Sequence, residues 1–202
     1  MTDSLSLPAI PAPLTWKNQP LDSSVSADGQ LTINAGAETD WFLDPVGGVV
    51  KVDAPIALFA PPDEQFWLKA RVTVNHAATF DAGVLFLYEN DSLWGKLCFE
   101  FSPQRQPMIV SVVTRGLSDD CNSVPVNGNS VYMRIYRRGD VLAFHYSLDG
   151  KFWHFVRYFT LGKLAQPRVG FSAQSPTGKS CQVTFSEIEY QTGLIADLRN
   201  GT

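Results

Sequence analysis

The stretch WGKLCFEFSPQRQPMIVSVVTR, residues 94–115, decides the fold. It predicts two β-strands joined by a short polar turn, because apolar residues alternate along each half and SPQRQP interrupts them. Side chains on a strand point to opposite faces with a period of two. On the first strand, one side holds Gly95, Leu97, Phe99 and Phe101, and the other holds Trp94, Lys96, Cys98 and Glu100. The first side is a core face, and the second is either a polar solvent face or a binding surface.

Alternating or continuous apolar segments recur on both sides of this stretch. They predict strands over residues 30–35, 66–75, 82–89, 131–138, 141–146, 152–160, 168–174 and 181–190. The segment AGVLFLYE, residues 82–89, is almost continuously apolar, as expected for a central strand covered on both faces. A polar loop is expected over 116–129. About a dozen strands with almost no helix indicate an all-β sandwich of two antiparallel sheets.

The domain organisation follows from length and pattern. A chain of 202 residues fits one β-sandwich domain. Residues 1–13 are rich in proline and predict an extended lead-in, residues 14–190 form the single domain, and residues 191–202 form a tail that is the only place for a short helix.

Composition excludes several classes of partner. The formal net charge of −4 weighs against nucleic acid, which requires a basic surface. No run of about 18 apolar residues occurs, so no membrane-spanning helix is expected. The first residues lack the basic and apolar regions of a secretory signal. Cys98, Cys121 and Cys181 show no CxxC spacing, and a reduced, cytoplasmic protein is predicted.

The polar side of the opening stretch is the first candidate ligand-binding surface. Ser111 and Arg115 join it if the turn keeps the two strands in phase, and further strands add side chains of the same kinds. The complete candidate set is Trp41, Trp94, Lys96, Glu100, Ser111, Arg115, Arg134, Tyr136 and Arg157. Arg157 either faces this surface or forms an internal salt bridge. The alternative is a polar outer sheet with cross-strand ion pairs, each contributing about 0–1 kcal/mol.

Two further motifs have mainly structural interpretations. Asp40 and Asp119–Asp120 lie in acidic loops, but no DxDxDG-type calcium loop occurs and no metal site is predicted. The histidines show no HxH or HxxxH pair. SLDGKFW, residues 147–153, predicts a tight hairpin in which Asp149 caps the turn. No nucleotide-binding or nucleophile-elbow motif appears, so no cofactor is expected.

Seven motifs in order carry a resemblance to a known family. They are ETDWF (38–42), FDAGVLF (80–86), LWGKLCFEF (93–101), SVVTRGLSDD (111–120), VYMRIYRRGD (131–140), YSLDGKFWHFVR (146–157) and SAQSP (172–176). Together they resemble the concanavalin A-like domain family of unknown function called "regulation of enolase protein". The resemblance implies a lectin/glucanase jelly roll of two curved antiparallel sheets, one of them concave. It supplies no catalytic residues. The chain departs from the family pattern in the order TDWF and in SDDC, where an aromatic residue is expected after the first Asp.

The resemblance and the residues together leave three functional hypotheses. The first is a non-catalytic domain that binds carbohydrate on its concave face, where a ring stacks on the sugar and charged groups bind its hydroxyls. The second is a protein-interaction module that regulates a glycolytic enzyme such as enolase, with aromatic and Arg side chains at the interface. The third is a divergent glycoside hydrolase. Glucanases of this fold often carry ExDxxE, but here EFSPQR retains only Glu100, so a second carboxylate would have to come from Asp40 or Asp81.

Overall fold

The opening stretch forms two paired strands in the computed structural model, which describes residues 4–202. They are β10 (Leu93–Phe101) and β11 (Pro107–Arg115). The strands pair antiparallel, with Trp94 opposite Thr114 and Glu100 opposite Met108. The predicted polar turn occupies the residues between them.

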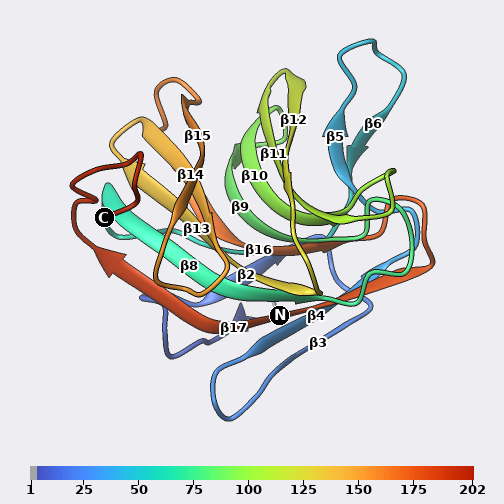
Figure 1. Cartoon of the computed structure of the whole chain (residues 1–202), viewed down its shortest axis with the longest axis horizontal. Coiled ribbons are helices and arrows are strands. Elements are labelled where there is room, and N and C mark those ends of the chain that lie inside the picture. Colours follow the sequence, from blue (N-terminus) through green and yellow to red (C-terminus); the bar gives the residue numbers. More distant parts are fainter. Residues whose placement is uncertain (1–3) are drawn as a thin grey trace.

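Two antiparallel sheets pack face to face, which confirms the predicted all-β sandwich (Figure 1). The eight-stranded sheet runs in the order β1 (Ser4–Leu5), β2 (Leu14–Lys17), β7 (Ile56–Phe59), β16 (Arg168–Gln174), β9 (Ala82–Asn90), β10, β11 and β12 (Leu117–Pro125). The seven-stranded sheet runs in the order β15 (His154–Thr160), β14 (Val141–Ser147), β13 (Ser130–Arg138), β8 (Gln65–Val74), β17 (Ser180–Thr192), β4 (Leu31–Gly36) and β3 (Asp22–Val25). A separate hairpin consists of β5 (Trp41–Leu43) and β6 (Val50–Val52).

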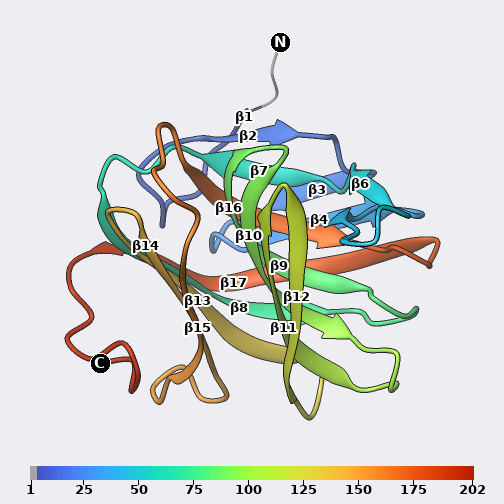
Figure 2. The same ribbon diagram turned by 90° about the horizontal axis from the view of Figure 1, so that it is seen from above.

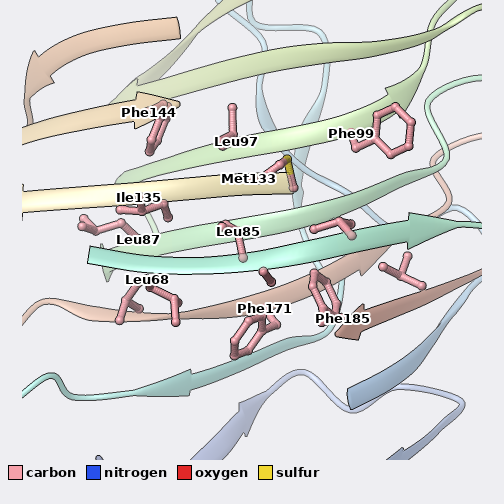
Figure 3. Packing of buried hydrophobic residues seen from close by; sticks show 14 of the residues in the cluster. Leu68, Leu85, Leu87, Leu97, Phe99, Met133, Ile135, Phe144, Phe171 and Phe185 are labelled. Carbon is pink, nitrogen blue, oxygen red and sulfur yellow. The ribbon is translucent and has the colours of Figure 1, made fainter. Parts of the chain in front are cut away.

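The main core lies between the two sheets (Figure 3). The eight-stranded sheet supplies Leu85, Leu87, Leu97, Phe99 and Phe171, and the seven-stranded sheet supplies Leu68, Met133, Ile135, Phe144 and Phe185. All of these side chains are almost completely buried. Each large apolar side chain removed from water contributes about 1.5–3 kcal/mol, so this layer is the main source of stability.

A second apolar layer covers the outer face of the eight-stranded sheet. Here Trp41 of the hairpin packs on Phe86, Tyr88 and Trp94 of β9 and β10. β9 is therefore buried on both faces, which explains its continuous apolar sequence and confirms the prediction of a central strand.

Two predicted segments differ from the structure. The expected loop at 116–129 is largely the edge strand β12, most of whose residues are exposed. A solvated edge strand needs few apolar residues, so its sequence resembles that of a loop.

The tail holds no helix within the described residues. β17 continues to Thr192, and residues 193–202 form bends and turns. Ile195 and Leu198 pack on Tyr136 and Ala143 of the seven-stranded sheet, and Figure 2 shows the C-terminal end beside β13–β15. The tail is held by this packing and by turn hydrogen bonds, in which the Asp197 N–H donates to the Thr202 carbonyl and the Gly201 N–H donates to the Asp197 carbonyl.

The predicted lead-in also takes part in the fold, because Ser4 and Leu5 pair with β2 and Leu7 is buried. Residues 1–3 lie outside the described part of the chain. Over residues 4–202, no helix has the length and apolar character needed to cross a membrane.

The contact between β16 and β7 gives a test of the packing. A Cβ atom at Gly170 would lie 1.8 Å from the Ala57 carbonyl oxygen, which belongs to the backbone and cannot turn aside. We expect Gly170→Ala to lower the free energy of unfolding by about 3 kcal/mol or more, measured by urea denaturation. Gly36→Ala is the control, because its new Cβ would meet only Leu21 at 3.6 Å. Equal stability of the two variants would contradict this packing.

Candidate functional site

The predicted row Trp94, Lys96 and Glu100 lies on one face of β10, but that face is not an open surface. The three residues expose 0%, 2% and 8% of their surface. The β5–β6 hairpin covers Trp94 from outside the sheet, and Asp40, which precedes the hairpin, covers Lys96. The Leu43 N–H also donates to Ser118 Oγ at 2.9 Å, so the sheet curves around the hairpin until β12 touches β5.

The two tryptophans of the candidate set are packing residues. The Trp41 ring meets the Trp94 ring edge to face, with centroids 6.0 Å apart, and its indole N–H donates to the Ala54 carbonyl at 2.8 Å. Neither ring is free to stack on a ligand. Both hold the hairpin against the sheet.

Lys96 is a buried ammonium with two partners from distant parts of the chain. Its Nζ lies 3.0 Å from Asp40 Oδ1 and 2.9 Å from Gln174 Oε1. Burial alone would lower the pKa of Lys96, but nearby negative groups, chiefly Asp40, outweigh burial and raise it. Lys96 is therefore charged and held in one position.

Glu100, in contrast to Lys96, has no partner: its carboxyl makes no hydrogen bond or ion pair with residues 4–202. Burial raises the pKa of Glu100 to about 8, and the charge of Lys96 only partly opposes this effect. The carboxyl is therefore mostly protonated at neutral pH. Asp120 on β12 is exposed, but partial desolvation raises its pKa as well.

A pocket of about 170 Å³ joins these groups. It lies between the hairpin and strands β10–β12, the elements that rise together in Figure 1. Its lining is Asp40, Phe42, Phe80, Lys96, Glu100, Val112, Asp120 and Gln174. The buried but unpartnered Glu100 carboxyl opens into this space.

Phe80 adds a sign of functional constraint at the pocket. Its φ of 70° is in the left-handed region, which bulky residues rarely occupy. Gln174 Nε2 donates to the Phe80 carbonyl at 3.3 Å, and the Phe80 N–H donates to the Phe101 carbonyl at 2.7 Å. Strained backbone of this kind clusters at binding and catalytic sites.

Ser111 and Arg115 lie on the face of the sheet opposite to Lys96 and Glu100, contrary to the prediction. The turn places Ser111 opposite Leu97 and Arg115 opposite Leu93, so both share the face that points toward the other sheet. The phase assumed for the two strands was wrong, because turn length sets register and a shift of one residue reverses the face. Arg115 Nη1 instead donates to the Thr160 carbonyl at 2.7 Å.

Arg157 forms a salt bridge with Asp119, as in one of its two alternatives, but the bridge lies at the surface, because the Asp119 side chain is 57% exposed. Arg157 Nη2 lies 2.9 Å from Asp119 Oδ2, and Arg157 Nη1 donates to Ser111 Oγ at 3.4 Å. These contacts join β15 to β11 and β12 across the sandwich.

Arg134 and Tyr136 belong to the seven-stranded sheet, so they do not extend the row on β10. Arg134 stacks 4.2 Å from the centre of the Trp153 ring and donates to the Gly201 carbonyl. Burial lowers the pKa of Arg134 to about 10. Tyr136 is covered by the tail. The nine candidate residues therefore divide among several places, and only Lys96 and Glu100 line the pocket.

Sequence reasoning did not select Phe42, Phe80 or Gln174, although all three lie in motifs that it had singled out. Asp120 was considered only as a loop acid, and Asp40 as a loop acid or the second carboxylate of a hydrolase. Asp81, the other proposed carboxylate, accepts hydrogen bonds from the Ala77 and Ala78 amides and the Ser175 hydroxyl, which makes it a structural clamp. Throughout 4–202, no three His, Cys, Asp or Glu side chains are grouped to hold a metal ion.

Comparison with solved structures finds other proteins with the same fold. A functionally unknown protein from Saccharomyces cerevisiae matches with a TM-score of 0.80 and 25% identity, covering 90% of this chain and 97% of that chain. A mutant of the GH43 protein BlXynB from Bacillus licheniformis matches with a TM-score of 0.72 and 14% identity, covering 89% of this chain but 37% of that chain. An alginate lyase from Klebsiella pneumoniae has a TM-score of 0.54 and 13% identity, with 85% and 84% covered. The last two likenesses show the fold alone.

The protein is thus a β-sandwich that resembles domains found in carbohydrate-active proteins. Its family model matches residues 16–193, and the chain belongs to the family described as "Protein of unknown function (DUF1349)". None of the curated proteins compared with the chain matches it.

The pKa of Glu100 predicts a specific pH dependence of stability. In the folded state Glu100 keeps its proton up to about pH 8, whereas the unfolded carboxyl loses it near the ordinary value of 4.5. The folded state then binds more protons between these values, so the contribution of Glu100 to stability falls as pH rises through this window. We expect Glu100→Gln to remove this fall and to exceed the wild type by about 2–4 kcal/mol at pH 8.5, with a small difference at pH 4.5. Urea denaturation across this range measures it, and parallel curves for the two proteins would show that Glu100 ionises normally.

Proposed function

We propose that this protein is a non-catalytic domain that binds a carbohydrate unit in the pocket beneath the β5–β6 hairpin. The observation that carries the proposal is the Glu100 side chain, which is 8% exposed, lines the pocket and makes no hydrogen bond or ion pair with residues 4–202. The carboxyl oxygens of Glu100 are not among the fully enclosed polar atoms without a partner, so they are open to the pocket, where a ligand hydroxyl can hydrogen-bond to them.

The size and lining of the pocket favour a single sugar ring. Its volume of about 170 Å³ corresponds to about six water molecules. Phe42 and Phe80 offer rings for the apolar face of a sugar, while Glu100 and Asp120 offer oxygen atoms for its hydroxyls. The fixed ammonium of Lys96 needs little ordering when a ligand arrives. The similarity to GH43 proteins and an alginate lyase supports the same ligand class by analogy of fold.

Phe42 allows the proposal to be tested with little risk to the core, because it lies half-buried on the short hairpin. We expect Phe42→Ala to weaken sugar binding about tenfold or more, since it removes a ring from the pocket. A glycan array followed by calorimetry measures the effect. Phe152→Ala is the matched control, because Phe152 is 62% exposed and does not line the pocket. An empty array with folded protein would refute carbohydrate binding, and equal loss in both variants would refute this pocket.

A divergent glycoside hydrolase is the second candidate function, and one observation favours it. Glu100 remains a proton donor at neutral pH, since its pKa is about 8, and Asp40 and Asp120 line the same pocket. Glycosidases pair a protonated carboxyl with a second, ionised carboxylate.

Chromogenic glycosides test this second candidate. If the chain is a hydrolase, Glu100→Gln abolishes turnover, because the amide cannot donate a proton as the acid does. Glu38→Gln, the same substitution at an exposed residue outside the pocket, keeps the activity. Turnover that survives Glu100→Gln, or no turnover by the wild type, excludes this role.

Regulation of a glycolytic enzyme such as enolase remains a prediction. It comes from the resemblance of the sequence motifs to the "regulation of enolase protein" family. Trp94, Arg134 and Tyr136 are aromatic and Arg members of the candidate set, but all three are buried, so a partner would have to use other residues. A cytoplasmic location also remains a prediction. It is supported by Cys98, Cys121 and Cys181, which are all free thiols.

A further inference from the structure

We infer that the pocket selects a ligand with a primary ammonium group, such as an amino sugar with a free amine, over neutral and acidic sugars. The inference rests on the proposed function and names the ligand class of the same site. The reason is that most hydrogen-bond donors of the pocket are already paired within the protein, whereas most of its acceptors are free.

The donors that line the pocket are largely used within the protein. Two of the three N–H donors of Lys96 are directed to Asp40 Oδ1 and Gln174 Oε1. The side-chain amide of Gln174 donates to the Phe80 carbonyl. The protonated Glu100 carboxyl adds one O–H donor, so few donors remain for a ligand that presents mainly acceptors.

The acceptors are largely unused. Glu100 makes no hydrogen bond with any described residue, and Asp120 lines the pocket with a partly desolvated carboxyl. Asp40 engages Lys96 and the Trp41 N–H through one oxygen, Oδ1, which leaves Oδ2 without those bonds. A pocket rich in free acceptors is complementary to a ligand rich in donors, and an ammonium group supplies three.

The charges lead to the same ligand class. Lys96 and Asp40 form an ion pair and offset each other. Arg157 also acts on Asp120 but is paired with Asp119, so Asp120 and any ionised fraction of Glu100 are the surplus. The strands on either side of Glu100 add no charge, because Ala82 and Met108 lie opposite it. An acidic sugar would meet repulsion here, whereas a cation would be attracted.

The environment of Glu100 predicts how the ammonium is recognised. The other titratable groups that act on its carboxyl are Lys96, Asp40 and Asp120, and Cys98 lies two residues away on the same strand. The pKa of the Cys98 thiol is raised by burial, so that group stays neutral. A bound ammonium stabilises the ionised carboxylate, so Glu100 releases its proton to solvent when the ligand binds. Phe42 and Phe80 offer ring faces that also attract cations.

Four ring compounds of similar size test the inference by calorimetry at pH 6.5, where the amine of glucosamine is protonated. They are glucosamine, glucose, glucuronic acid and cyclohexylamine. We expect glucosamine to bind at least about tenfold more tightly than glucose, and glucuronic acid to bind most weakly. Titration in two buffers of different ionisation enthalpy measures the proton released with glucosamine.

Two pocket variants and one control locate the effect. Glu100→Gln and Asp120→Asn each lower glucosamine affinity about tenfold, since a hydrogen bond to a charged group is lost. Glu100→Gln also abolishes proton release. Glu38→Gln removes one negative charge at an exposed residue outside the pocket and changes neither quantity.

The outcomes separate this inference from the proposed function. Glucose or glucuronic acid binding as tightly as glucosamine overturns the inference and leaves carbohydrate binding intact. Cyclohexylamine binding as tightly as glucosamine supports ammonium recognition and overturns the preference for a sugar. Failure of all four compounds to bind the folded protein overturns both.

Discussion

The burial of both faces of β9 and β10 is the constraint on which the rest of the structure depends. One face forms the core between the sheets, and the other is covered by Trp41 and the hairpin that carries it. A sheet face that is apolar over β9 must be covered, because exposed apolar area of this size is unfavourable in water. The hairpin covers that area but stops short of Glu100, and the pocket lies at its boundary.

The ion pair between Lys96 and Asp40 shows how a charge is accommodated in this layer. A buried ion pair has little net value for stability, because both charges lose their hydration. Its geometric effect is larger, since it ties the segment before β5 to β10 and Gln174 ties β16 to the same ammonium. The carboxyl of Glu100, four residues further along, has no comparable partner. Lys96 is paired within the protein, whereas the Glu100 carboxyl is free to bind a ligand, and this contrast underlies the proposed preference for ligands that donate hydrogen bonds.

The sequence predicted part of the site, but not the distant residues that cover and complete it. Alternation correctly placed Trp94, Lys96 and Glu100 on one face of a strand. It could not reveal that Trp94 is covered, because the covering residue, Trp41, lies more than fifty positions earlier in the chain. The same reasoning placed Ser111 on the wrong face, since an error of one residue in a turn reverses every side chain after it.

The sequence by itself determined the all-β class, the doubly buried central strand and the two faces of β10, because side-chain alternation is a local property of the extended backbone. Only the tertiary structure decided which strands are neighbours, and it put Arg134 and Tyr136 on the other sheet under the tail. It also brought Asp40, Phe80, Asp120 and Gln174 around Glu100. These choices depend on contacts between distant segments, which the period of a single strand does not encode.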